Sequence, residues 1–168
     1  TWGNLANRVL AFAYKNWDGH APTPGKLRAD DHEILKVIEN GFRTVGEHIE
    51  AVRLRAALFE ALRLATEVNK YLDKAAPWTE IKSDKVAAAT TVYTALKAID
   101  SLKVLFAPFL PFSSERLHRY LGYEQPIFGV QTTQSLSDAL GIHVGLLYQP
   151  DGASGKWAPS QLQPGQAL

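Results

Sequence analysis

The 168-residue sequence contains no cysteine and no methionine, and each absence narrows what the chain can be. Without cysteine it can form no disulfide, no thiolate metal site and no cysteine-based catalytic nucleophile. This composition suits a reducing compartment, and we expect a cytoplasmic protein. Because a natural translation product begins with methionine, we interpret the chain, which starts at Thr1, as a piece of a longer protein.

Long apolar runs and an excess of one charge are also missing. No stretch approaches the roughly 18 apolar residues that a membrane-spanning helix needs, so we expect no membrane contact. The start of the chain lacks the pattern of a signal peptide. Formal net charge is only +1, from 18 basic and 17 acidic residues. Overall electrostatic attraction therefore cannot carry nucleic-acid binding, and any RNA contact must come from a few placed residues.

Catalytic and metal-binding patterns are absent as well. The five histidines show no two-histidine helical metal spacing; they stand at positions 20, 32, 48, 118 and 143. Glu47-His48 resembles part of a metal motif but lacks the second histidine, so we interpret it as a solvated helix end. No glycine-rich phosphate loop or serine nucleophile elbow is present. We therefore expect no catalytic residue, metal or cofactor within this chain.

Apolar residues recur at helical spacing through most of the chain, which predicts an all-α bundle of four to five helices over residues 1–123. Glycine, proline and capping residues set the expected boundaries. The first expected helix covers residues 2–17, and the second runs from Asp30-Asp31 to a break near Gly46 and His48. The third runs from Glu50 to Lys74, the fourth from Ser83 or Asp84 to Pro108, and a short fifth from Ser113 to Leu121.

Residues 124–168 change in character and form an irregular extension rich in proline, glycine, glutamine and serine. The apolar run from Ile142 to Tyr148 could be a strand, which Asp151-Gly152 would turn back towards Trp157 as a short hairpin. We expect this extension to pack on the bundle or on a catalytic domain that is not part of the sequence.

Two polar residues of the first helix are candidates for recognition. Asn4 and Arg8 are four residues apart, so they are neighbours on one helical face, roughly opposite the apolar stripe. Lys15 lies on the same side and is a supporting candidate. An ordinary solvated face is the alternative. The forked donors of Arg8 and the mixed amide of Asn4 could together match the Watson–Crick edge of an unstacked base.

Trp78 is the third candidate. It follows Pro77 at the end of a predicted helix and is surrounded in the sequence by charged and polar residues. The indole could fold back as an anchor on the core, or it could be a platform on which a base stacks.

These residues lie within two motifs that resemble the anticodon-binding domain of methionyl-tRNA synthetases. The first is Asn-Leu-Ala-Asn-Arg at 4–8, and the more specific second is Asn-Lys-Tyr-Leu-Asp-Lys-Ala-Ala-Pro-Trp at 69–78. The order of helices and motifs also fits, and the resemblance covers residues 1–123 well. The nucleotide-binding, zinc-binding and activation-loop signatures of the family's catalytic domain are absent from the chain.

The resemblance implies a role for each matching position. In the family these residues recognise the cytosine that opens the methionine anticodon, which here means Asn4, Arg8 and Trp78, with Pro77 fixing the approach of the indole. The end of the third helix should then lie beside the start of the first helix. The implied partners are the methionine tRNA and the catalytic domain of the same chain. ATP-dependent attachment of methionine to tRNA would belong to the whole enzyme, with ATP as its cofactor, and the piece itself would be non-catalytic.

Two alternatives remain at this point. The chain could be the anticodon domain of another class I synthetase, such as the leucine, valine, isoleucine or cysteine enzyme, or a helical protein-interaction module without an RNA role. An exposed Trp78 beside Asn4 and Arg8 would favour RNA binding, whereas a Trp78 packed in the core would favour the module.

Overall fold

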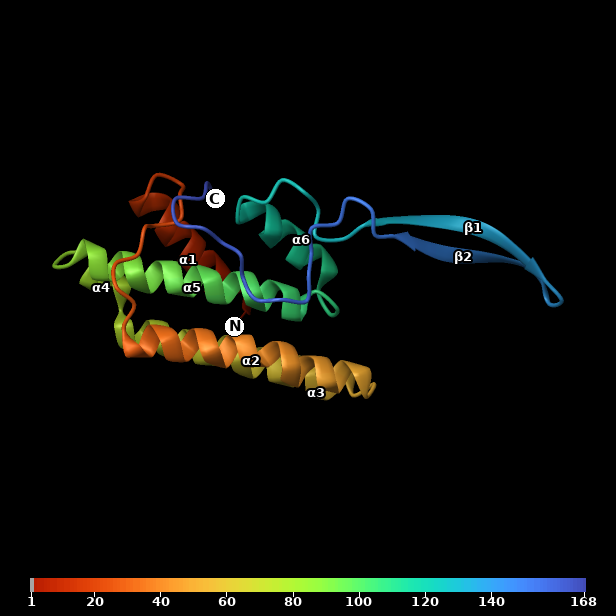
Figure 1. Cartoon of the computed structure of the whole chain (residues 1–168), viewed down its shortest axis with the longest axis horizontal. Coiled ribbons are helices and arrows are strands. Elements are labelled where there is room, and N and C mark those ends of the chain that lie inside the picture. Colours follow the sequence, from red (N-terminus) through yellow and green to blue (C-terminus); the bar gives the residue numbers. More distant parts are fainter. Residues whose placement is uncertain (1) are drawn as a thin grey trace.

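The structure is a computed structural model that describes residues 2–168, and within them it contains a helical bundle with a projecting hairpin (Figure 1). Five helices have ten or more residues, and one is a single turn. This confirms the all-α bundle predicted from the sequence. The elements are α1 (Trp2–Asn16), α2 (Ala29–Glu50), α3 (Leu54–Ala75), α4 (Pro77–Glu80), α5 (Lys85–Phe106), α6 (Pro111–Tyr120), β1 (Val130–Asp138) and β2 (Gly141–Gln149).

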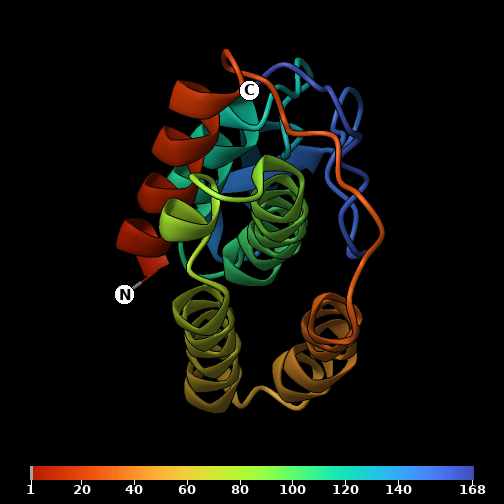
Figure 2. The ribbon, with the colours of Figure 1, turned by 90° about the vertical axis from the view of Figure 1, so that its left-hand side faces the viewer.

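Helix α5 is the centre of the bundle. Of its 22 residues 17 are buried, on all sides of the helix, whereas the other long helices bury a single face. Figure 2 looks along α5 and shows α1 on one side, the C-terminal segment on the other, and the α2–α3 pair below. The largest side chains that are fully buried on α5 are Leu96, Ile99, Leu102, Leu105 and Phe106. The other elements are therefore positioned by a shared central helix.

One predicted helix boundary is confirmed by a capping residue, and another is wrong. The side chain of Asp84 accepts hydrogen bonds from the N–H groups of Val86 and Ala87, which confirms the predicted start of α5. The predicted break near Gly46 and His48 is wrong, because α2 continues to Glu50. Gly46 lies within the helix and faces the indole of Trp157, where a Cβ would lie at an ordinary van der Waals distance of 3.4 Å from Nε1.

The third helix also begins later than predicted, at Leu54 rather than Glu50. Residues 51–53 form the connection between α2 and α3, and Val52 takes a left-handed conformation there, with φ of 57°. A β-branched residue rarely adopts this conformation, so no sequence rule would place the reversal at Val52.

The hairpin prediction was correct for one strand and wrong for its partner. Ile142–Tyr148 does lie in a strand, β2. This strand pairs antiparallel with the preceding segment β1, with Val130 opposite Gln149 at one end and Asp138 opposite Gly141 at the other. Asp151-Gly152 is therefore not the hairpin turn. The chain reverses at Ala139-Leu140, where a carboxylate oxygen of Asp138 accepts from the N–H of Leu140 at 2.8 Å.

Residues 150–168 return to the bundle and run along it (Figure 1). Leu162 is buried, and its carbonyl accepts from the hydroxyl of Tyr93 at 3.0 Å. The indole N–H of Trp157 donates to the carbonyl of Phe42 at 2.9 Å. This segment therefore closes one side of the core. None of the described helices is both long and apolar enough to cross a membrane.

Candidate nucleic-acid interface

A sharp bend between α3 and α4 determines where Trp78 lies. Ala76 adopts a left-handed conformation, with φ of 44° and ψ of 56°, and its N–H donates to the carbonyl of Leu72 at 2.8 Å, which ends α3. Pro77 is buried and occupies the first turn of α4, where its missing N–H costs nothing. The next residue, Trp78, is thereby directed back towards α1.

The ring of Trp78 contacts two residues of α1. Its edge-to-face partner is Phe12, with centroids 5.9 Å apart and planes at 82°. The guanidinium carbon of Arg8 lies over the indole, 4.6 Å from the ring centroid, which is a cation–π geometry. Trp78 is only partly buried, so it combines an anchoring contact with an accessible surface.

Residues of α3 hold the guanidinium of Arg8 in place. One terminal nitrogen donates to the side-chain oxygen of Asn69 at 3.2 Å, and the other lies 3.6 Å from a carboxylate oxygen of Asp73. The amide nitrogen of Asn69 donates in turn to the carbonyl of Ala65 at 3.0 Å, which orients its oxygen towards Arg8. Nε of Arg8 is buried and has no acceptor among the described residues.

The expected convergence is present for two of the three principal candidates. Arg8 and Trp78 are in direct contact, and the end of α3 lies beside α1, as predicted. Asn4 lies one helical turn before Arg8; it is exposed, and its side chain makes no hydrogen bond within residues 2–168. Lys15 is also exposed, two turns after Arg8 on the same helix. Arg8 and Trp78 are therefore assembled within the chain itself, whereas the side chain of Asn4 stands free of both.

Sequence reasoning did not assign functions to Asn69 and Asp73, although both stand in the second motif. Their spacing of four residues places them on one face of α3, and that face meets Arg8. The spacing was visible in the sequence. What could not be read from the sequence is which of the several faces of α3 lies beside α1.

An ionic cluster around the buried Asp31 joins α4 to α2 and α3. The guanidinium of Arg28 binds both carboxylate oxygens of the fully buried Asp31, each at 3.1 Å. The hydroxyl of Tyr71 donates to Asp31 at 2.6 Å, and Arg28 also reaches Glu80 of α4 at 3.3 Å. Burial alone would raise the pKa of Asp31, but hydrogen bonds from Arg28 and Tyr71 outweigh it and lower that pKa. The cluster thus ties α2, α3 and α4 together as a charged unit.

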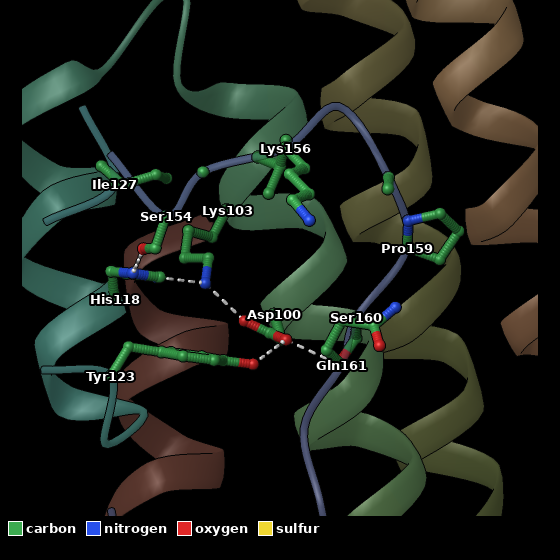
Figure 3. A pocket seen from close by; sticks show the side chains of 13 residues that line it. Asp100, Lys103, His118, Tyr123, Ile127, Ser154, Lys156, Pro159, Ser160 and Gln161 are labelled. Atoms are coloured by element: carbon green, nitrogen blue, oxygen red, sulfur yellow. Dashed lines mark hydrogen bonds and ion pairs between the residues drawn. The ribbon is translucent and has the colours of Figure 1, made fainter. Parts of the chain in front are cut away.

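A second polar cluster lies at the other end of α5, around a cavity of about 280 Å³ (Figure 3). Lys103 donates to Asp100 and to Nδ1 of His118, the latter at 2.7 Å. His118 Nε2 lies 2.8 Å from the hydroxyl of Ser154 in the C-terminal segment. Tyr123 donates to Asp100 at 2.8 Å. The cluster therefore joins α5, α6 and the C-terminal segment.

The chemistry of this second cluster is structural. Asp100, Lys103 and His118 are each at most 4% exposed, and their charged or polar atoms bind one another. An ammonium only donates, so Nδ1 of His118 accepts and its ring is neutral. Burial and the neighbouring ammonium lower the pKa of His118, and burial lowers the pKa of Lys103. With its groups already paired, the cluster offers no free nucleophile or base.

Comparison with known proteins resolves the family. A family model described as the anticodon binding domain of methionyl tRNA ligase matches residues 21–145. The chain belongs to the methionine–tRNA ligase family. The methionine–tRNA ligases of Thermomicrobium roseum and Chloroflexus aggregans are 48% and 49% identical to it over its whole length, yet the chain spans only 29% and 28% of them.

A solved structure agrees with this assignment. The methionyl-tRNA synthetase of Mycobacterium tuberculosis bound by methionyl-adenylate superposes on 99% of the chain with a TM-score of 0.78 and 25% identity, and 29% of that enzyme is covered. Membership of the methionine–tRNA ligase family excludes the leucine, valine, isoleucine and cysteine enzymes considered from the sequence. The matched region 21–145 contains Trp78 and Asn69, whereas Asn4 and Arg8 precede it.

Proposed function

We propose that the chain recognises the methionine anticodon for a methionine–tRNA ligase, and that Asn4, Arg8 and Trp78 contact the cytosine that opens it. The observation that carries the proposal is the guanidinium of Arg8 held over the indole of Trp78 at 4.6 Å. ATP-dependent attachment of methionine to tRNA would be performed by the rest of the ligase, in the cytoplasm, with no cofactor bound by this chain.

The chemistry of cytosine matches these side chains. Its Watson–Crick edge offers two acceptors, O2 and N3, and one donor, the N4 amino group. Arg8 can donate to both acceptors because its guanidinium carries donors in a planar fork. Asn4, one turn away and exposed, can accept from the amino group. Uracil carries an N–H at the N3 position, so a donor of Arg8 would meet another donor there and form no hydrogen bond.

Stacking on Trp78 would supply affinity that is the same for any of the four bases. The guanidinium of Arg8 covers one face of the indole. A base must therefore take the other face or move Arg8 aside. The ion pair with Asp73 opposes such movement little, because Arg8 and Asp73 are 35% and 68% exposed and such ion pairs contribute about 0–1 kcal/mol. The base would also have to replace the contacts of Arg8 with Asn69 and Trp78.

The interaction-module alternative has less support. Trp78 is neither fully exposed nor packed in the core; it rests on Phe12 and carries Arg8 on its face. A core anchor would be fully enclosed, whereas Trp78 is half-buried and lies beside the partly exposed side chain of Arg8. Both side chains therefore remain accessible to an incoming base.

A binding experiment with a methionine-anticodon stem-loop tests the proposal. We expect the chain to bind a fluorescently labelled stem-loop, measured by anisotropy, and to prefer cytosine at the first anticodon position. Trp78→Ala should weaken binding roughly 5–150-fold, the range for the loss of one stacked base. Affinity should be modest in all cases, since few phosphates are neutralised by a chain of net charge +1.

Trp157→Phe is the matched control, because Trp157 is also partly exposed but lies against α2 rather than α1. Binding by this variant should equal that of the unsubstituted chain. Binding that is indifferent to the first anticodon base, or equally weakened by both substitutions, would argue against the proposed site.

A further inference from the structure

The β1–β2 hairpin exposes a row of apolar side chains that the bundle does not cover. Residues that face each other in an antiparallel pair share one side of the sheet. Ile142, Val144 and Leu146 pair with Ser137, Ser135 and Thr133, so one side of the hairpin carries an aliphatic row next to a hydroxyl row. The three aliphatic side chains are 79%, 75% and 66% exposed.

This arrangement is unfavourable for a hairpin surrounded by water. Each strand has nine residues, and the hairpin projects away from the helices along its whole length (Figure 1). A lone two-stranded hairpin is marginally stable in water, and its exposed apolar edge is a site for unwanted pairing. Covering these three aliphatic side chains would remove their surface from water and so stabilise the hairpin.

The base of the hairpin is held firmly, so the row points in a fixed direction. The N–H of Ile127 donates to Glu115 of α6 at 2.9 Å, and the N–H of Gly155 donates to the carbonyl of Ile127 at 3.1 Å. The hydroxyl of Tyr148 accepts from the N–H of Gly129 at 2.8 Å. A Cβ at Gly129 would lie 1.9 Å from the carbonyl oxygen of Gln149, so only glycine allows the strands to leave the bundle this closely.

The charges of the hairpin favour a protein surface over RNA as its cover. From residue 120 to residue 155 the sequence contains no lysine or arginine, while it contains Glu124, Asp138 and Asp151. Phosphate groups would find no cation there, and RNA binding depends on such cations. The relatives supply a protein candidate, because the chain spans only 28–29% of their length.

We propose that the face formed by Ile142, Val144 and Leu146 docks on the part of the ligase polypeptide that lies outside these 168 residues. The inference rests on the proposed function in one respect only, namely that this chain works within a longer ligase. The hairpin would then act as a rigid arm that fixes the orientation of the anticodon-binding helices relative to the rest of the enzyme.

Hydrogen exchange of the full-length protein tests the docking. We expect the amides of β2 to exchange at least roughly tenfold more slowly in the unsubstituted protein than in Val144→Asp, a ratio that corresponds to about 1.4 kcal/mol. Gln134→Asp is the matched control, because Gln134 pairs with Gly145 and so lies on the opposite side of the hairpin. Its exchange should resemble that of the unsubstituted protein. Unchanged protection of α5 would show that the bundle of each variant is folded.

A photo-crosslinking amino acid at position 144 identifies the occupant. Crosslinks to peptides of the same molecule outside these 168 residues would support the proposal. Crosslinks between two molecules, with a doubled mass in solution, would overturn it in favour of a dimer, and protection that appears only when tRNA is added would overturn it in favour of RNA. Equally fast exchange in all three proteins would show an undocked hairpin. None of these readouts depends on which anticodon base is preferred.

Discussion

Two clusters in this molecule use the same ingredients and differ in burial. Each contains a cation, a carboxylate and an aromatic ring whose face meets the cation: Arg8 with Asp73 and Trp78 on one side, and Lys103 with Asp100 and Tyr123 on the other. Lys103 and Asp100 are each 3% exposed, whereas Arg8 and Asp73 remain in contact with solvent.

Burial determines what each cluster can do. A buried ion pair that loses one partner leaves an uncompensated charge, so its groups are committed to the fold. A partly exposed pair contributes little to stability and can exchange one partner for another at low cost. The cluster that contributes least to the free energy of folding is therefore the one suited to binding a ligand.

The largest expected effect concerns the buried pair. Lys103→Ala should lower the free energy of unfolding by about 3–5 kcal/mol, because Asp100 would remain buried without its cation. Asp73→Asn, the counterpart in the exposed cluster, should change it by less than about 1 kcal/mol. Urea unfolding of both variants measures the difference. Similar losses of unfolding free energy in the two variants would contradict the claim that burial separates the two clusters.

A smaller loss of stability should appear on acidification. The folded state lowers the pKa of His118 below its ordinary value of 6.5, mainly through burial and secondly through the ammonium of Lys103. The unfolded chain then binds the proton more readily than the folded one. This contribution to stability is thus fully present above about pH 6.5 and is lost as pH falls through the lowered pKa of the folded state.

His118→Gln sharpens this second prediction. Glutamine can accept from Lys103 and donate to Ser154 but does not titrate, so its stability should fall less between about pH 7.5 and 5. An identical acid response in the unsubstituted chain and His118→Gln would contradict the assignment of this response to His118.

The sequence predicted best where local chemistry decides. Ser83 or Asp84 was expected to cap a helix, and Asp84 does so; Pro77 was expected to end one, because the hydrogen-bonding capacity of each residue is local. The contact of Arg8 with Trp78 was expected from the family resemblance, and it is present. Ala76 gave no warning of the left-handed turn that starts α4, since alanine rarely adopts that conformation.

The hairpin was predicted less well for a related reason. Strand β1 has mostly polar residues on both sides, so it lacks the alternation that marks a half-buried strand. The two central residues of its turn, Ala139 and Leu140, are not ordinary turn residues, although Asp138 and Gly141 flank them. Asp151-Gly152 places its turn residues side by side, and the prediction followed that stronger local signal. Pairing between distant segments is decided by tertiary context that such signals do not contain.

The most direct test of the account combines a base change with a side-chain change at Arg8. Affinities of the unsubstituted chain and of Arg8→Gln would be measured for stem-loops that begin the anticodon with cytosine or with uracil. The account predicts a preference for cytosine of about 1–3 kcal/mol in the unsubstituted chain, the usual worth of a paired contact to a base edge, and no preference in Arg8→Gln. An equal preference in both proteins would contradict it, because Arg8 would then take no part in reading the base.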